Sequence, residues 1–253
     1  MTIQVGLIGN DGIILASDLR VTADIKIMEE YEGTAAYIGD LHRKIEFNQR
    51  VAISCADDLK FARMVAKRII AGLTDADLID EGSANSAIER IIDDASSSEK
   101  KKAQWLVAIR CPEWQLFKCR LSPVDPERTD GEWDRSCALS FGWAVAGQVT
   151  NPAIFLSKFH DEFLVSEQRI MLAAHIIMSA NHFNSQGIEG LEIVQCDANG
   201  VRRLSPDSIA ALKKKSSILD KNIDDYLKKN DDGFSYDETP DTPQRTSANT
   251  PSK

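Results

Sequence analysis

Basic residues are in deficit in this sequence. Its 253 residues carry 30 Lys and Arg against 39 Asp and Glu, a formal net charge of −9. Affinity for nucleic acid depends chiefly on clustered Lys and Arg that neutralise phosphates. The basic cluster Lys213 to Lys215 is too short to supply such a surface. The composition therefore argues against a nucleic-acid partner.

Cysteine and histidine are few and scattered. The sequence has five cysteines and four histidines, with no CxxC spacing and no spacing typical of metal ligands or of a Ser-His-Asp triad. We therefore expect free thiols in a reducing cytoplasm, and neither a metal nor a cofactor. The residues concerned are Cys55, Cys111, Cys119, Cys137 and Cys196, with His42, His160, His175 and His182.

Long apolar runs are also lacking. No run approaches the roughly 20 residues that a membrane-spanning helix needs. The first residues show no basic segment followed by an apolar one, the pattern typical of a signal peptide. The sequence thus predicts no membrane partner and a cytoplasmic location.

The apolar residues that are present suffice for one core. We expect one domain over residues 1–215 and a polar tail over residues 216–253. Within the tail, residues 230–253 are rich in Asp, Thr, Ser and Pro and hold too few apolar side chains to fold, so they are predicted to be disordered.

Hairpins of strands alternate with pairs of helices along the domain. This order predicts an α+β fold, a four-layer αββα sandwich of two antiparallel sheets flanked by helix pairs. Strands are expected at 3–9, 13–18, 44–48, 51–56, 103–111, 113–121, 138–148, 191–197 and 201–205. Helices are expected at 58–72, 84–95, 151–164, 166–183 and 206–213, with loops at 23–42, where a short strand could lie, and at 122–136.

Chemistry-bearing residues crowd at the start of the chain, in "MTIQVGLIGNDGIILASDLRVT". If Met1 is removed, Thr2 carries both a hydroxyl and a free α-amine, whose reference pKa of about 7.7–8.0 lets it accept a proton near neutral pH. One residue can then be nucleophile and base. A neighbouring cation would disfavour the protonated amine, and an acid would hold that cation in place.

The segment "TIQVG…GIILASDLRVT" resembles the N-terminus of proteasome-type β subunits, which are N-terminal-nucleophile hydrolases. The resemblance implies that Thr2 is the nucleophile, that Asp18 fixes an active-site lysine, and that Arg20 is a supporting polar residue. In this family the lysine precedes the third strand, which "HRKIEF" matches at Lys44. Lys26, in the preceding loop, is the alternative lysine.

Three further segments stand where the family has site motifs, and the second and third depart from the family's pattern. "VAISCADD" resembles the turn whose backbone N–H forms the oxyanion hole, which assigns that role to Ser54. "GQVT" stands where a Ser usually assists the threonine amine and places Gln148 there. In "FNSQGIEG", Asn184 and Ser185 are the nearest counterparts of the family's Asp-x-x-Ser motif.

The resemblance implies a threonine peptidase that acts on peptides or proteins. Such an enzyme is expected to form a homo-oligomeric ring or stacked rings, with an ATPase as a further partner. Two alternatives stay open. One is a non-catalytic subunit that keeps the fold for assembly, and the other is an amidase for a small amide, whose pocket the loop over residues 23–42 would narrow.

Overall fold

A computed structural model describes residues 2–26, 32–37, 43–98, 101–124, 133–147, 150–182 and 190–229. The chain divides into two units, Met1–Ser216 and Ser217–Lys253. The description below concerns the first unit. The predicted disorder of residues 230–253 lies outside the described residues.

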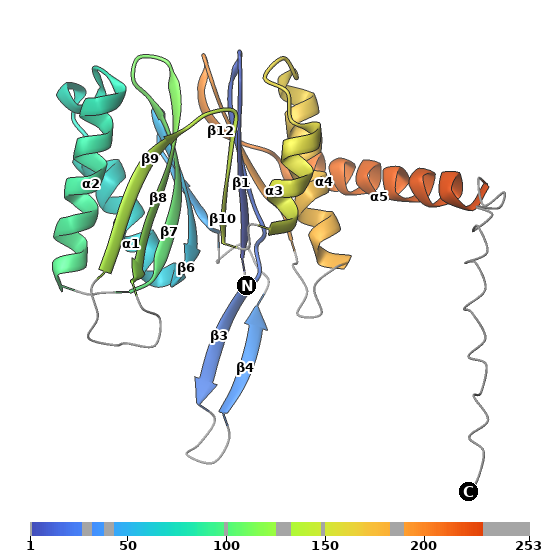
Figure 1. Ribbon diagram of the computed structural model, residues 1–253, viewed down its shortest axis with the longest axis horizontal. Coiled ribbons are helices and arrows are strands. Elements are labelled where there is room, and N and C mark those ends of the chain that lie inside the picture. The colour runs from blue at the N-terminus through green and yellow to red at the C-terminus, as the bar shows by residue number, and fades with distance from the viewer. Residues whose placement is uncertain are drawn as a thin grey trace, which may run out of the picture. The chain divides into compact units, whose positions relative to one another are not determined.

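Two five-stranded antiparallel sheets form the centre of the first unit (Figure 1). In the first sheet the strand order is β10-β1-β2-β11-β12, and in the second it is β5-β6-β7-β8-β9. The first contains β1 (Ile3–Gly9), β2 (Gly12–Ser17), β10 (Trp143–Gly147), β11 (Glu192–Asp197) and β12 (Gly200–Arg203). The second contains β5 (Ile45–Phe47), β6 (Val51–Asp57), β7 (Ala103–Arg110), β8 (Trp114–Pro123) and β9 (Trp133–Ser140).

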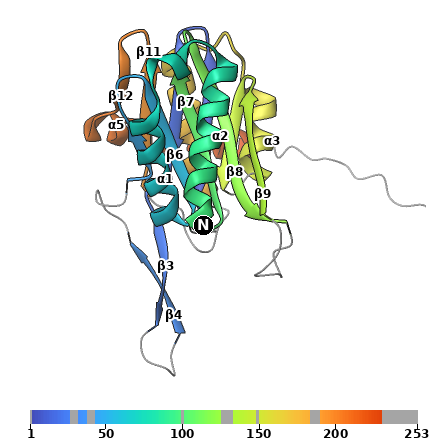
Figure 2. The same cartoon turned by 90° about the vertical axis from the view of Figure 1, so that its left-hand side faces the viewer.

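Helices cover the outer face of each sheet, α1 and α2 on one side and α3 and α4 on the other (Figures 1 and 2). Apolar side chains fill all three layers between these elements. The predicted α+β sandwich is therefore confirmed. The helices are α1 (Leu59–Gly72), α2 (Glu81–Ser98), α3 (Thr150–Phe159), α4 (Ser166–His182) and α5 (Pro206–Lys229), with a 3-10 helix at Asp75–Leu78. None of the described helices is long and apolar enough to cross a membrane.

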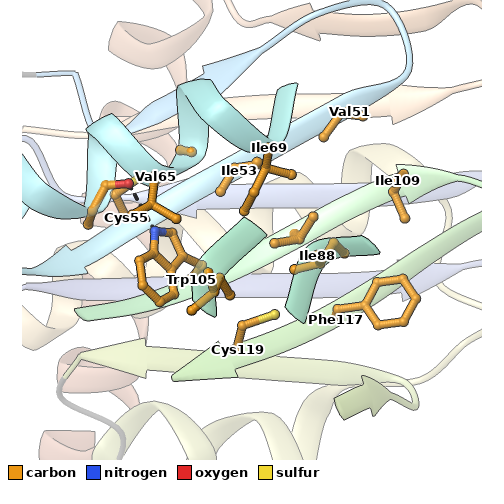
Figure 3. Packing of buried hydrophobic residues seen from close by; sticks show 14 of the residues in the cluster. Val51, Ile53, Cys55, Val65, Ile69, Ile88, Trp105, Ile109, Phe117 and Cys119 are labelled. Carbon is orange, nitrogen blue, oxygen red and sulfur yellow. Dashed lines mark hydrogen bonds between the residues drawn. The ribbon is translucent and has the colours of Figure 1, made fainter. Parts of the chain in front are cut away.

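The strands carry apolar side chains on both faces because each sheet is covered on both sides. All six residues of β2 are buried. In the outer layer of the second sheet, Trp105 packs among Val65, Ile88 and their neighbours (Figure 3). Its indole N–H donates to the carbonyl of Ala62 at 2.9 Å, so the largest buried side chain leaves no polar group unpaired.

Several sequence predictions of local structure were wrong. The loop expected at 23–42 contains an antiparallel hairpin, β3 (Val21–Lys26) and β4 (Glu32–Tyr37), which its charged composition concealed. The single strand expected at 138–148 is two strands in different sheets, β9 and β10. Gly142, at φ +76°, provides the sharp turn between them. The loop expected at 122–136 is shorter than predicted, because β8 extends to Pro123 and β9 begins at Trp133.

Two further predictions need correction. The helix expected at 206–213 continues to Lys229, because lysines recur in the extension and Ile218, Leu219, Ile223 and Leu227 follow helical spacing. Cys119 and Cys137 form a disulfide rather than free thiols, since the β8–β9 register sets them directly opposite each other. Cys55, Cys111 and Cys196 are free and buried.

Candidate active site

The β1–β2 hairpin brings the two ends of the opening segment together. Gln4 pairs with Ser17 in the antiparallel register, so Thr2 and Asp18 lie at the same end of the hairpin. The N–H of Ile3 donates to Asp18 Oδ1 at 2.9 Å, and the N–H of Asp18 donates to the Ile3 carbonyl at 3.3 Å. The Asp18 carboxylate is thereby fixed beside the residue that follows Thr2.

Lys44 reaches this point from the second sheet, immediately before β5. Its Nζ lies 2.9 Å from Asp18 Oδ2 and donates to Thr2 Oγ1 at 3.0 Å. Lys44 is 1% exposed and Asp18 is fully buried. The three side chains thus form one chain of carboxylate, ammonium and hydroxyl, with the hydroxyl at its half-buried end.

Burial alters the acidity of this site. Desolvation lowers the pKa of the Lys44 ammonium from its ordinary value, and the carboxylates of Asp18 and Glu192 oppose that shift. An amine with a lowered pKa releases and takes up a proton more readily near neutral pH. Its contact with the Thr2 hydroxyl therefore permits both charge stabilisation and proton transfer at that oxygen.

A glycine holds the backbone of Thr2 in place from β10. Gly147 pairs with Ile3 and has φ +79°, a conformation that other residues rarely adopt. A Cβ at Gly147 would lie 2.1 Å from the carbonyl oxygen of Thr2. This close approach explains the glycine and ties the position of Thr2 to the end of β10.

Solved structures share this architecture. The chain aligns with an Anbu Gly-1 mutant from Hyphomicrobium sp. strain MC1 at a TM-score of 0.66 and 14% identity, over 94% of this chain and 100% of the other. The fold is Anbu-like. Anbu from the same strain aligns at a TM-score of 0.65 and 15% identity, over 92% of this chain and 100% of that one.

Anbu from Yersinia bercovieri, described as an ancestral beta-subunit, gives a TM-score of 0.61 and 11% identity over 89% and 96% of the two chains. No protein-family model matches the sequence. No curated protein matches it either. Because the identities are low, the likeness shows an Anbu-like, proteasome-like fold and does not carry activity with it.

In this fold Thr2, Asp18 and Lys44 are in contact, whereas the hydroxyl of Ser54 bonds to another residue. The hydroxyl of Ser54, in the middle of β6, donates to Gln4 Oε1 at 3.0 Å. The N–H of Cys55 points to β5 and donates to the Lys44 carbonyl, so the N–H of Ser54 points the other way, to β7. This orientation gives no support to an oxyanion role for Ser54, which stays a prediction.

The remaining predicted residues have different outcomes. Arg20 is half-buried two residues after Asp18. Lys26 ends β3, and its side chain lies outside the described part of the structure. Gln148, Asn184 and Ser185 also lie outside the described residues, so their assigned roles stay predictions.

Two charged residues beside the site were missed by the sequence analysis. Glu192, at the start of β11, is 4% exposed and accepts the backbone N–H groups of Lys44 and Ile45. Arg203, at the end of β12, pairs with Glu192 at 2.7 Å. The available signal was weak: a single acid in the otherwise apolar "LEIVQC" and one of two adjacent arginines on the next strand.

Metal binding finds no support in the described residues. No group of three or more His, Cys, Asp and Glu side chains among them could hold a metal ion. The chemistry available at this site is that of a hydroxyl, an ammonium and a carboxylate.

Proposed function

We propose that this protein is a proteasome-like threonine hydrolase that cleaves peptide bonds with Thr2 after removal of Met1. The observation that carries the proposal is the contact of Lys44 Nζ with both Thr2 Oγ1, at 3.0 Å, and Asp18 Oδ2, at 2.9 Å. A threonine hydroxyl alone is a poor nucleophile and needs an adjacent group that takes its proton. Lys44 neutralises the buried Asp18 carboxylate, and the same ammonium also reaches the half-buried Thr2 hydroxyl, a contact that the ion pair alone does not require.

The reaction follows from these groups. The Thr2 oxygen bonds to the substrate carbonyl carbon while its proton passes to the free α-amine of Thr2, directly or by way of Lys44. The carbon–nitrogen bond then breaks, and the leaving amine takes that proton. An ester on Thr2 remains. Water attacks its carbonyl carbon and gives a proton to the same amine, which passes that proton to the Thr2 oxygen as the ester bond breaks. Asp18 keeps Lys44 oriented throughout.

The assembly and the partners belong to the same proposal. A peptidase with an open site would degrade its neighbours, so we expect a closed homo-oligomer, a ring or stacked rings, in the cytoplasm. An ATPase that admits substrate fits such a chamber. Native mass spectrometry of the purified protein measures the oligomer directly, and a monomer at micromolar concentration would contradict this part of the proposal.

A non-catalytic assembly role is the second candidate, and the orientation of the Ser54 N–H favours it. Hydrolysis of a panel of fluorogenic peptides and small amides separates the candidates. Thr2→Ser keeps a hydroxyl, whereas Thr2→Val has the same shape without one. The proposal predicts activity in wild type and in Thr2→Ser and none in Thr2→Val. Equal rates in wild type and Thr2→Val would rule out Thr2 as nucleophile, and inert wild type with a retained Met1 would favour the assembly role.

A further inference from the structure

The backbone of Lys44 is held by both sheets. Its carbonyl accepts the N–H of Cys55 on β6 at 2.9 Å, which belongs to the second sheet. Its N–H donates to Glu192 Oε2 on β11, in the first sheet, at 3.0 Å, and the N–H of Ile45 donates to the same oxygen at 3.2 Å. One carboxylate oxygen therefore fixes the point at which the chain enters β5.

Glu192 is itself fixed. It pairs with Ser17 in the β2–β11 register, one residue before Asp18, and it is 4% exposed. An Arg203 Nη2 atom lies 2.7 Å from Glu192 Oε1 and donates to the Ile45 carbonyl at 2.9 Å. The guanidinium also stacks over the Phe47 ring at 4.7 Å. The pair thus bonds to both backbone polar groups of Ile45, its N–H and its carbonyl.

These contacts matter because few other interactions fix the position of β5 along its neighbour β6. The strand is three residues long and lies at the edge of its sheet. Two backbone N–H groups that lose a buried acceptor must find another one, and the chain would shift to reach it. A shift at Lys44 would move its Nζ away from Thr2 Oγ1, the contact on which the chemistry depends.

We propose that Glu192, held by Arg203, is the positioning residue of the active site and sets the distance from Lys44 to Thr2. The inference rests on the proposed function for its catalytic consequence and on the backbone contacts for its structural one. Glu192 touches neither Thr2 nor the reacting atoms and acts through the Lys44 backbone.

The same two strands provide a matched control. Asp197 and Arg202 also form a carboxylate–arginine pair between β11 and β12. The Asp197 carboxylate accepts the N–H of Asn199 and does not bond to β5. Loss of this control pair removes the same two charges from the same two strands and leaves the Lys44 backbone contacts in place.

Steady-state hydrolysis tests the catalytic consequence. Glu192→Met removes the acceptor and is expected to lower kcat about 100-fold with little change in KM, as a small misplacement of a reacting group does. Glu192→Gln keeps an acceptor oxygen and is expected to retain most of the wild-type kcat. Arg203→Met should lower kcat less than Glu192→Met. Arg203 and Glu192 both line a surface pocket of about 380 Å³, so water from this pocket can replace the guanidinium as the partner of Glu192. Asp197→Asn and Arg202→Met should match wild type.

A second readout does not require activity. The pH titration of the Lys44 side chain by ¹³C NMR, assigned with Lys44→Arg, reports on its surroundings. The charged groups that face this region are Asp18, Glu192, Arg43 and Arg203. Removal of Met1 would add the Thr2 amine. Glu192→Gln removes a nearby negative charge, so the titration should move to lower pH. Glu192→Met should give a titration different from that of Glu192→Gln, because it removes the same charge and also moves Lys44 relative to Asp18 and to solvent.

The outcomes separate the two proposals. If wild type hydrolyses nothing, the proposed function fails, and the titration alone decides the positioning role. Glu192→Met with wild-type kcat, or with an unchanged Lys44 titration, would overturn the inference. Equal losses in the Asp197 and Arg202 variants would also overturn it, since they would reveal a general effect of these strands. If Glu192→Met fails to fold, Glu192→Gln and Arg203→Met apply the same two readouts.

Discussion

Two buried cations stand at opposite ends of the β1–β2 hairpin, and each is 1% exposed. At one end Lys44 bonds to the side chains of Asp18 and Thr2. At the other end Arg169, on α4, donates to the carbonyls of Gly12 at 2.6 Å and Leu164 at 3.2 Å and forms an ion pair with Asp11. The two ends share burial and charge but differ in what the cation contacts.

The contact partners of the two cations distinguish a structural charge from a reactive one. Backbone carbonyls accept hydrogen bonds but do not react, so the contacts of Arg169 hold the turn of the hairpin against α4. Burial lowers the pKa of the Arg169 guanidinium, yet this group stays charged in proteins. Burial also lowers the pKa of the Lys44 ammonium, which can change its protonation state, and it contacts a hydroxyl.

We expect the largest loss of activity when the reactive cation, Lys44, is replaced by the other cation type. Lys44→Arg keeps the charge beside Asp18 but replaces the amine with a larger group that cannot take up a proton. We expect a loss in kcat of at least about 100-fold and a loss of stability of roughly 1–3 kcal/mol from overpacking. Peptide hydrolysis and urea unfolding measure the two effects. A wild-type rate would mean that only the charge of Lys44 matters.

Arg169→Met is expected to show the opposite pattern. It leaves the buried Gly12 carbonyl and the part-buried Leu164 carbonyl without their donor, so unfolding should become easier by roughly 1–3 kcal/mol. Asp11 is exposed and adds little to this loss. In molecules that remain folded, kcat should be unchanged, because the reacting groups are at the far end of the hairpin. A large fall in kcat at a temperature where the variant is fully folded would contradict the division of roles.

One glycine lies against the backbone or cation at each end of the hairpin, Gly147 beside Thr2 and Gly9 beside Arg169. A Cβ at Gly147 would press on the Thr2 carbonyl, whereas a Cβ at Gly9 would meet the Arg169 guanidinium at 2.4 Å. Gly147→Ala also places alanine at a positive φ, with an expected strain of about 1–3 kcal/mol. We expect Gly147→Ala to lower kcat as well as the melting temperature and Gly9→Ala to lower the melting temperature alone. The reverse pattern would show that the two ends have been assigned wrongly.

The pH dependence tests the sign of the electrostatics at the reactive end. A cation beside the free Thr2 amine disfavours its protonated form, so Lys44→Met should raise the amine pKa. The residual rate should then rise with pH at higher values than in wild type, because the amine must lose its proton before it can accept one. A pH–rate profile for both proteins measures the shift. An unchanged midpoint would indicate that Lys44 does not face the Thr2 amine.

The smallest effect is expected from deletion of residues 231–253. The segment is polar and offers too little apolar surface to offset its ordering entropy. Melting temperature, elution volume and the rate on short peptides should all match those of the full chain. A lower melting temperature together with a smaller oligomer would mean that the tail contributes to an interface.

The contacts around Thr2 were predictable to different extents. Thr2 and Asp18 lie on one short hairpin, so local apolar patterning and a turn at residues 10–12 suffice to bring them together. Lys44 was reached through the resemblance, since "HRKIEF" alone does not distinguish it from a solvated lysine. Glu192 and Arg203 lie about 150 residues further on, and the register between distant strands that places them at Lys44 leaves no local signal.

The fold shows the same dependence on long-range pairing. Apolar periodicity identified both helix pairs and the layered arrangement. It could not reveal that the segment "ALSFGWAVAG" crosses from one sheet to the other at Gly142, because its residues are almost continuously apolar on both sides of that turn. The β3–β4 hairpin escaped for another reason: the alternation of Val21, Ala23 and Ile25 in β3 is short, and β4 carries Gly33 and two adjacent alanines that show no alternation.

Thr2, freed of Met1, is the proposed nucleophile. Intact-mass spectrometry after incubation with a peptide epoxyketone, which reacts with the hydroxyl and the amine of an N-terminal threonine together, measures this role without a substrate. We expect a chain that lacks Met1 and carries one adduct on Thr2, with no adduct on Thr2→Val and a slower reaction on Lys44→Arg. A chain that retains Met1, or an adduct on any residue other than Thr2, would contradict it.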